Sequence, residues 1–135
     1  MATFKDTLVE QLTGADFSNT EPHKLKKPRC AVVLFYAEWC GYCNDLKPEY
    51  IKFADMAQFI KVYAVDSDAQ KPLMQRLKNG PLAIKGFPTI WLYCNGEPVR
   101  EYKGTRTAQD LLQTSMKLCK AECTCEKGVC NENTQ

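Results

Sequence analysis

The sequence predicts an α/β fold in which helices flank a central mixed β-sheet. Two observations carry this prediction. Short runs of β-branched and aromatic residues alternate with segments whose apolar residues recur every three or four positions, the pattern of parallel strands joined by helices. Two further strand-like runs flank the turn sequence Asn-Gly-Glu at 95–97, which predicts an antiparallel hairpin. A sheet with both kinds of pairing is mixed.

The first half of the chain contains two predicted strands and a long predicted helix. The run AVVLFYA at 31–37 is short and apolar, so we expect a buried strand. Apolar residues at helical spacing then predict a helix from about Gly41 to Phe59. Pro48 lies inside this helix and predicts a kink near Asn44, whose carbonyl its ring approaches. The run KVYAV at 61–65 predicts the second strand.

The second half adds a short helix, the hairpin and a last helix. Lys71–Pro72 opens the short helix, because proline is favoured at the first helical position, and Asn79–Gly80 closes it. The hairpin strands are 88–94 and 98–103. Thr107 with Asp110 resembles a capping box and begins a helix that ends at about Lys120. The first 30 residues are weakly patterned, with Val9 to Leu12 as the candidate for a further strand.

Length and composition are those of one ordinary globular domain. The chain has 135 residues, 25% of them charged, and a formal net charge of only +2. One basic cluster, His23 to Arg29, is best interpreted as a solvated loop, so nucleic acid is not an expected partner. No run approaches the roughly 18 apolar residues that a membrane span needs, so we expect no membrane partner. We expect a domain over residues 1–120 and a cysteine-rich tail over 121–135.

Cysteine usage and the N-terminal sequence give opposite indications of the compartment. The first 14 residues carry no apolar core with a small-residue cleavage site, so no secretory signal is expected and the cytoplasm is the default. Eight cysteines in a chain of this size favour an oxidising compartment such as the ER lumen, if the chain is processed. The sequence leaves both open.

The motif Trp-Cys-Gly-Tyr-Cys at 39–43 joins the first predicted strand to the first helix. The unpaired N–H groups and positive potential of a helix N-terminus favour thiolate over thiol at Cys40, and a thiolate is a nucleophile at neutral pH. Cys43 lies one turn on and can attack a mixed disulfide at Cys40. A zinc site would need a second ligand pair nearby, and a structural bridge here would close too short a loop to add much stability. The motif therefore predicts redox chemistry.

The residues around this motif resemble a known family. VVLFYAEWCGYCNDLKPEY is similar to the active-site segment of thioredoxins and, more closely, of the catalytic a-type domains of protein disulfide isomerases. IKGFPTIWLYCNGEPVREYKGTRTAQDLL resembles their second half, so the similarity covers roughly residues 9–120. The resemblance implies a thioredoxin fold and dithiol–disulfide exchange without a cofactor or metal. It implies protein substrates with disulfides or thiols and an unidentified electron donor or acceptor. We expect a monomer.

The resemblance also assigns roles to individual residues. It implies that Cys40 attacks the substrate and Cys43 resolves the mixed disulfide. It places Pro88 at the family's cis-proline, with Phe87 before it in the stretch that binds substrate backbone. Arg106 matches an arginine thought to approach the resolving cysteine and lower its pKa, against the alternative of a solvated loop charge. The implied docking surface is Trp39, Gly41, Tyr42, Phe87 and Pro88.

Two departures from the family concern the redox site. The family's buried acidic residue, which takes the resolving cysteine's proton, is replaced by Leu34, and Val62 and Ala64 occupy the face where its partner lysine would lie. We therefore expect proton removal from Cys43 to depend on water and Arg106, and slow resolution to favour isomerisation. Tyr42 replaces the usual proline or histidine, and tyrosine carries no positive charge at neutral pH.

The third departure is the tail. Cys119, Cys123, Cys125 and Cys130 can form disulfides, bind one zinc or stay free, and their spacing favours disulfides or free thiols over zinc. The resemblance implies that strands 31–37 and 88–94 are antiparallel neighbours, which would bring Cys30 and Cys94 close together, but a bridge between them is the less favoured outcome. A non-enzymatic module that uses the tail for metal or partner binding is the alternative function, and the intact cysteine pair argues against it.

Overall fold

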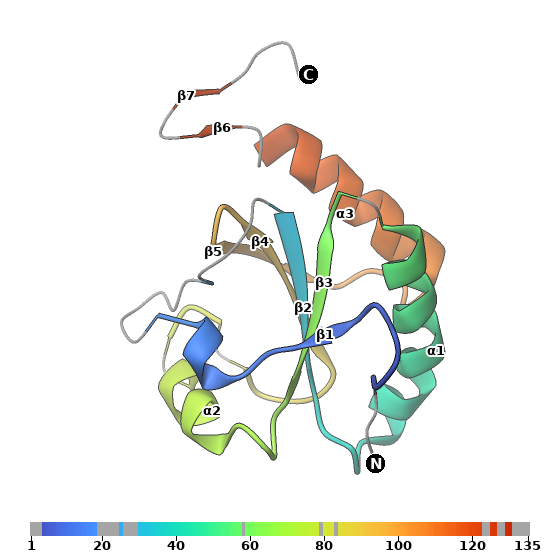
Figure 1. Ribbon diagram of the computed structural model, residues 1–135, viewed down its shortest axis with the longest axis vertical. Coiled ribbons are helices and arrows are strands. Elements are labelled where there is room, and N and C mark those ends of the chain that lie inside the picture. The colour runs from blue at the N-terminus through green and yellow to red at the C-terminus, as the bar shows by residue number, and fades with distance from the viewer. Residues whose placement is uncertain are drawn as a thin grey trace.

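The computed structural model describes residues 4–18, 25, 30–57, 59–78, 80–82, 84–122, 125–126 and 129–130, with side chains only as far as Lys120. A five-stranded sheet forms the centre, in the order β1-β3-β2-β4-β5 (Figure 1). Helices α1 and α3 cover one face, and α2 covers the other. The expected α/β fold with a mixed sheet is confirmed.

The elements follow the predicted order. The strands of the sheet are β1 (Glu10–Gln11), β2 (Cys30–Tyr36), β3 (Lys61–Asp66), β4 (Thr89–Cys94) and β5 (Glu97–Tyr102). The helices are the short 3-10 helix η1 (Gly14–Asp16), α1 (Gly41–Met56), α2 (Lys71–Leu77) and α3 (Ala108–Glu122). A separate antiparallel pair, β6 (Cys125–Glu126) and β7 (Val129–Cys130), lies in the tail and was not predicted. No helix of the described residues is long and apolar enough to cross a membrane.

Strand β2 is the centre of the sheet and is buried along its whole length. It pairs parallel with β3 and antiparallel with β4, so that Leu34 lies between Ala64 and Ile90. Strand side chains alternate between faces: Leu34 joins the cluster under α1 and α3, whereas Val33 joins the cluster under α2. This two-sided burial explains why the run is continuously apolar.

Three boundaries differ from the sequence prediction. Helix α1 ends at Met56 because the backbone of Ala57 is extended (φ −86°, ψ 111°). Phe59 is then exposed, while Ile60, directly before β3, is buried. Helix α2 already ends at Leu77. Strand β1 covers only Glu10–Gln11, which are exposed, whereas Val9 and Leu12 on either side of it are buried.

Two further expectations are only partly covered by the structure. Pro48 lies inside α1 as expected, and its missing N–H leaves the Asn44 carbonyl without its usual helical donor. The basic cluster at 23–29 lies outside the described residues apart from Leu25. The division between domain and tail at residue 120 stays a prediction.

Candidate active site at the start of helix α1

Cys40 is the N-cap residue of α1, directly after the loop that follows β2. Its backbone is extended (φ −84°, ψ 116°), and its sulfur accepts a hydrogen bond from the backbone N–H of Cys43, with 3.1 Å between N and Sγ. The sulfur thus satisfies one of the N–H groups that a helix start leaves unpaired. The sequence prediction that the motif joins strand to helix is confirmed.

The loop before β4 brings a second segment to Cys40. The Cys40 thiol donates to the carbonyl oxygen of Phe87 across 3.5 Å, and the Phe87–Pro88 peptide bond is cis, as the family resemblance implied. Residues far apart in sequence therefore meet at one sulfur. This places two of the expected docking residues within reach of a group bonded to Cys40.

Cys43 is a free thiol in an unfavourable place for a charge. Only 5% of the surface of Cys43 is exposed to solvent. Burial, together with the hydrogen bond and charge of Cys40, raises the pKa of Cys43 to about 12, while the Ala37 backbone and Arg106 act in the opposite direction. Loss of its proton is therefore the difficult step for this cysteine.

The core below the cysteine pair is apolar. Leu34 and Ala64 are register partners on β2 and β3, and Val62 lies on the same face of the sheet. All three belong to the buried cluster that also contains Cys40 and Cys43. The positions where the family resemblance led us to look for a carboxylate and a lysine thus hold hydrocarbon side chains.

Aromatic side chains surround the cysteine pair at the surface. Trp39 and Tyr42 are each 70% exposed, which is unusual for residues of this size. The Trp39 ring meets the Phe87 ring edge to face, with centroids 6.0 Å apart. Gly41 leaves open space above the helix start, since a Cβ built there would touch nothing within 4 Å.

Arg106 approaches the site from the loop between β5 and α3. Its guanidinium carbon lies 5.9 Å from the centre of the Tyr42 ring. The loop itself is held by the Tyr102 hydroxyl, which contacts the Thr105 carbonyl and the Asp110 carboxylate. Burial and Asp110 raise the pKa of Tyr102, so its hydroxyl keeps its proton. No sequence pattern predicted this anchor.

The same anchor alters the predicted capping box of α3. The Thr107 hydroxyl accepts from the Asp110 N–H across 3.2 Å as expected, but the Asp110 carboxylate contacts Tyr102. Glu49 on α1 caps the helix start instead, by accepting from the Ala108 N–H across 2.8 Å. A Cβ at Gly104 would crowd the Asp110 carboxylate and the Tyr102 hydroxyl, so a larger residue there would displace the two groups of the anchor.

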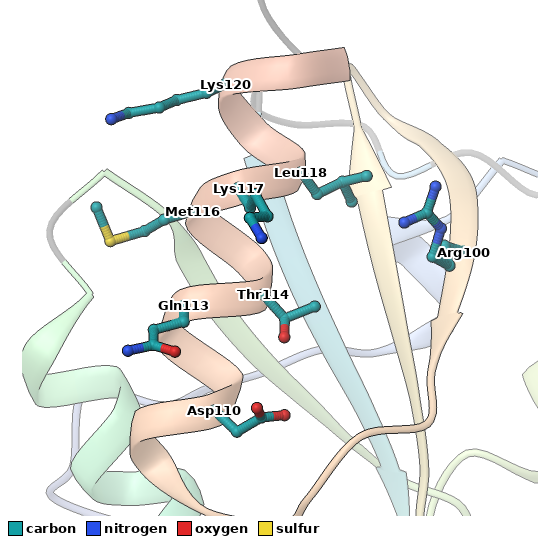
Figure 2. Close-up of a pocket in the computed structure, with 8 residues that line it drawn as sticks. All are labelled: Arg100, Asp110, Gln113, Thr114, Met116, Lys117, Leu118 and Lys120. Atoms are coloured by element: carbon teal, nitrogen blue, oxygen red, sulfur yellow. The ribbon is translucent and has the colours of Figure 1, made fainter.

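Two surface hollows lined by described residues are large enough to compare with the site. One of about 310 Å³ borders Phe87 on the α2 side and is lined by Met74, Ile84 and Lys71 among others. A larger open hollow of about 660 Å³ lies between β5 and α3, lined by residues such as Arg100 and Lys117 (Figure 2). The larger one contains none of the predicted site residues, so the smaller one is the more relevant to the cysteine pair.

Cys30, Cys94 and Cys119 are oxidised, and they lie near the opposite end of β2. Cys30 forms a disulfide with Cys119, with their Cα atoms 5.9 Å apart, and Cys94 is also disulfide-bonded. Cys30 and Cys94 are register partners, which confirms their predicted proximity, but no bridge joins them. A zinc site that used all four tail cysteines would need Cys119 as a thiolate, and this residue is bonded to the core instead.

Comparison with known proteins shows the family. Residues 9–131 match the family model described as Thioredoxin. The chain belongs to the thioredoxin family. It is 35% identical over 114 residues to "Protein disulfide-isomerase like 2-2" of Arabidopsis thaliana, a match that covers 84% of this chain and 24% of that protein. It is 37% identical over 101 residues to "Protein disulfide-isomerase A6 homolog" of Drosophila melanogaster, covering 73% and 22%. The chain thus spans about a quarter of the length of these relatives.

Solved structures agree on the thioredoxin fold. The Trx4 domain of ERdj5 superposes with a TM-score of 0.66 at 24% identity, over 82% of this chain and 95% of that one. The J-Trx1 fragment of ERdj5 superposes with a TM-score of 0.69 at 21% identity, over 88% of this chain and 56% of that one. The first thioredoxin domain of mouse protein disulfide-isomerase A4 superposes with a TM-score of 0.60 at 26% identity, over 78% of this chain and 74% of that one. Within the thioredoxin family, the chain is close to the catalytic domains of protein disulfide isomerases.

Proposed function

We propose that this thioredoxin-family chain is a thiol–disulfide oxidoreductase and isomerase that acts on protein disulfides through Cys40 and Cys43. The observation that carries the proposal is the hydrogen bond from the Cys43 N–H to the Cys40 sulfur at a helix start. These two cysteines are free thiols, whereas Cys30, Cys94 and Cys119 are oxidised. The names of the relatives support the same chemistry.

The reaction is a pair of thiol–disulfide exchanges. The Cys40 thiolate attacks one sulfur of the substrate disulfide; a new S–S bond forms, and the other substrate sulfur leaves with the electron pair of the broken bond. Cys43 then loses its proton and attacks the Cys40 sulfur, which releases the second substrate thiolate. Two electrons have passed to the substrate, and the protein holds a Cys40–Cys43 disulfide. The reverse sequence oxidises a substrate dithiol.

Slow resolution would direct this chemistry towards isomerisation. The raised pKa of Cys43 means that little of it is thiolate at neutral pH, and Leu34 offers no acceptor for its proton. The mixed disulfide at Cys40 then persists, which gives other thiols of the substrate time to attack it. Arg106 would assist Cys43 by stabilising the developing thiolate.

Substrate would dock on the exposed residues around Cys40. Trp39, Tyr42 and Phe87 supply apolar surface beside the reacting sulfur, and Gly41 leaves open space for a peptide. Pro88, which is half-buried, follows Phe87 in the same segment. The hollow beside Phe87 continues this surface. Protein substrates, a separate electron donor or acceptor and a monomeric enzyme fit this arrangement.

Reactivation of ribonuclease with scrambled disulfides tests the proposal, with reduction of insulin as the measure of net electron transfer. We expect the wild type to reactivate ribonuclease in a glutathione buffer, and Cys40→Ser to lose both activities. Cys43→Ser should retain part of the isomerisation and lose the reduction of insulin. Equal activity of Cys40→Ser and the wild type would overturn the proposal.

A further inference from the structure

The side chain between the two cysteines contacts a cation from a distant loop. Tyr42 is 70% exposed, and the Arg106 guanidinium carbon lies 5.9 Å from the centre of its ring. This distance lies within the range over which an aromatic ring attracts a guanidinium group. The contact joins the first turn of α1 to the loop that follows β5.

The loop brings Arg106 to this place because it is fixed on both sides. The Tyr102 hydroxyl contacts the Thr105 carbonyl, directly before Arg106, and the Asp110 carboxylate, in the first turn of α3. Lys103, in the same loop, pairs instead with Glu101, with 4.0 Å between Nζ and Oε1. Arg106 is therefore the loop cation that reaches the cysteine pair.

Without a contact that holds it, the Arg106 side chain would adopt many conformations. It is exposed, and a long exposed side chain samples many rotamers unless something holds it. Among the described residues, Cys40 and Arg106 are the groups that act on Cys43 through charge, the first raising and the second lowering its pKa. The place of the guanidinium thus affects how readily Cys43 becomes a nucleophile.

We propose that Tyr42 is a positioning residue, whose ring holds the Arg106 guanidinium beside the cysteine pair and so speeds the attack of Cys43 on the mixed disulfide. The proposal rests on the proposed function, in which Cys43 resolves what Cys40 has formed. Tyr42 acts through Arg106: it takes no proton and bonds to no reacting atom.

Single-turnover kinetics with the chromogenic disulfide dithiobis(nitrobenzoate) isolate this step. Reduced Cys40 attacks the reagent and releases one coloured thiolate, at a rate proportional to reagent concentration. Cys43 then attacks the Cys40 sulfur, the bond to the second aromatic thiol breaks, and that thiol leaves as thiolate with the electron pair. The Cys43 proton passes to water. This second phase is independent of reagent concentration and reports resolution.

Tyr42→Ala should slow the second phase about two- to fivefold near pH 7, as expected from loss of a solvent-exposed cation–π contact. Tyr42→Phe keeps the ring and should stay close to the wild type. Arg106→Ala should be slowed at least as much as Tyr42→Ala, and the double variant no more than Arg106→Ala alone. Lys103→Ala removes a cation from the same loop and should leave the second phase unchanged.

The outcomes separate this proposal from the proposed function. If the wild type releases no second coloured thiolate, the cysteine pair does not exchange disulfides and the proposed function fails. If the wild type shows both phases, three results overturn the positioning role alone: Arg106→Ala resolves at the wild-type rate, Tyr42→Ala does so, or Tyr42→Ala slows resolution further when Arg106 is already absent. Tyr42 and Arg106 are both exposed, so none of these variants is expected to unfold.

Discussion

Leu34 on β2 lies directly opposite Ala64 on β3, and both belong to the buried cluster that contains Cys43. Cys43, which must lose a proton, therefore belongs to a buried cluster with apolar residues at both of these positions. A buried carboxylate without a partner would be costly here, so an apolar pair at these two positions is a consistent combination.

Leu34→Glu should speed the resolution of mixed disulfides, because it supplies a proton acceptor to the cluster around Cys43. Leu34→Gln is the matched control, since it has nearly the same shape and no basic group. The measurement is the second phase of the single-turnover reaction for both variants. Both should lose stability from the buried polar group, and only Leu34→Glu should gain rate. A Leu34→Glu variant with unchanged resolution rate and unchanged Cys43 pKa would contradict the role given to this position.

The rate of resolution should rise with pH and show no plateau in the neutral range. Only the thiolate attacks, and the thiolate fraction grows about tenfold per pH unit below the pKa of the thiol. Burial is the largest cause of the raised pKa of Cys43 and persists when Cys40 is in a mixed disulfide, so this increase should continue through about pH 9. The second phase, measured across this range, is the test. A plateau near pH 7 would mean that Cys43 ionises far more easily than its burial indicates.

The Cys30–Cys119 disulfide should stabilise the fold without taking part in the reaction. It joins residues 89 positions apart, and long loops give the larger stabilisation, so replacing both cysteines by alanine should lower the free energy of unfolding by about 2–4 kcal/mol. Cys30 begins β2, and Cys40 follows the other end of that strand, about 20 Å away. Insulin reduction should therefore stay close to wild type.

Urea denaturation measures the loss of stability, and Met116→Ala, on the exposed side of α3, controls for a change to the helix itself. A double variant as stable as the wild type would show that the bridge does not constrain the chain. Loss of insulin reduction in a variant that is still folded would show that the two ends of β2 are coupled.

Trp39→Ala should weaken the binding of protein substrates more than the reaction with small disulfides. The ring is largely exposed and meets Phe87, whose carbonyl accepts from the Cys40 thiol. Removing such an aromatic anchor typically costs on the order of 1–2 kcal/mol of binding. We expect a higher KM for scrambled ribonuclease and an unchanged first phase with dithiobis(nitrobenzoate). An equal loss in both assays would assign Trp39 to the chemistry.

The main elements could be predicted because each satisfies a strong local rule. The run from Ala31 to Ala37 is apolar on both faces since helices cover both sides of β2. Apolar spacing extended α1 too far, to Phe59, because that side chain is apolar and yet exposed, and the backbone leaves the helix at Ala57. The spacing of apolar residues shows where apolar side chains occur, but it does not show whether each one is buried.

The contacts between segments distant in sequence could not be predicted from the sequence. Spacing offers several pairings among the tail cysteines, whereas Cys119 is bonded to Cys30 on the central strand, 89 positions away in the sequence. The contact of Arg106 with Tyr42 depends on where Tyr102 and Asp110 fix the loop, which no local pattern specifies. The cis bond before Pro88 was expected from family resemblance alone.

The central claim is that Cys40 attacks and Cys43 resolves, and trapping the intermediate tests it most directly. Cys43→Ser and Cys40→Ser, each with its one remaining active-site thiol reduced, are mixed with glutathione disulfide near pH 7, and the intact masses are followed over time. The account predicts that Cys43→Ser gains one glutathione quickly and keeps it, while Cys40→Ser gains it far more slowly. An adduct that forms equally fast on both variants, or on Cys40→Ser alone, would contradict the assignment of the two roles.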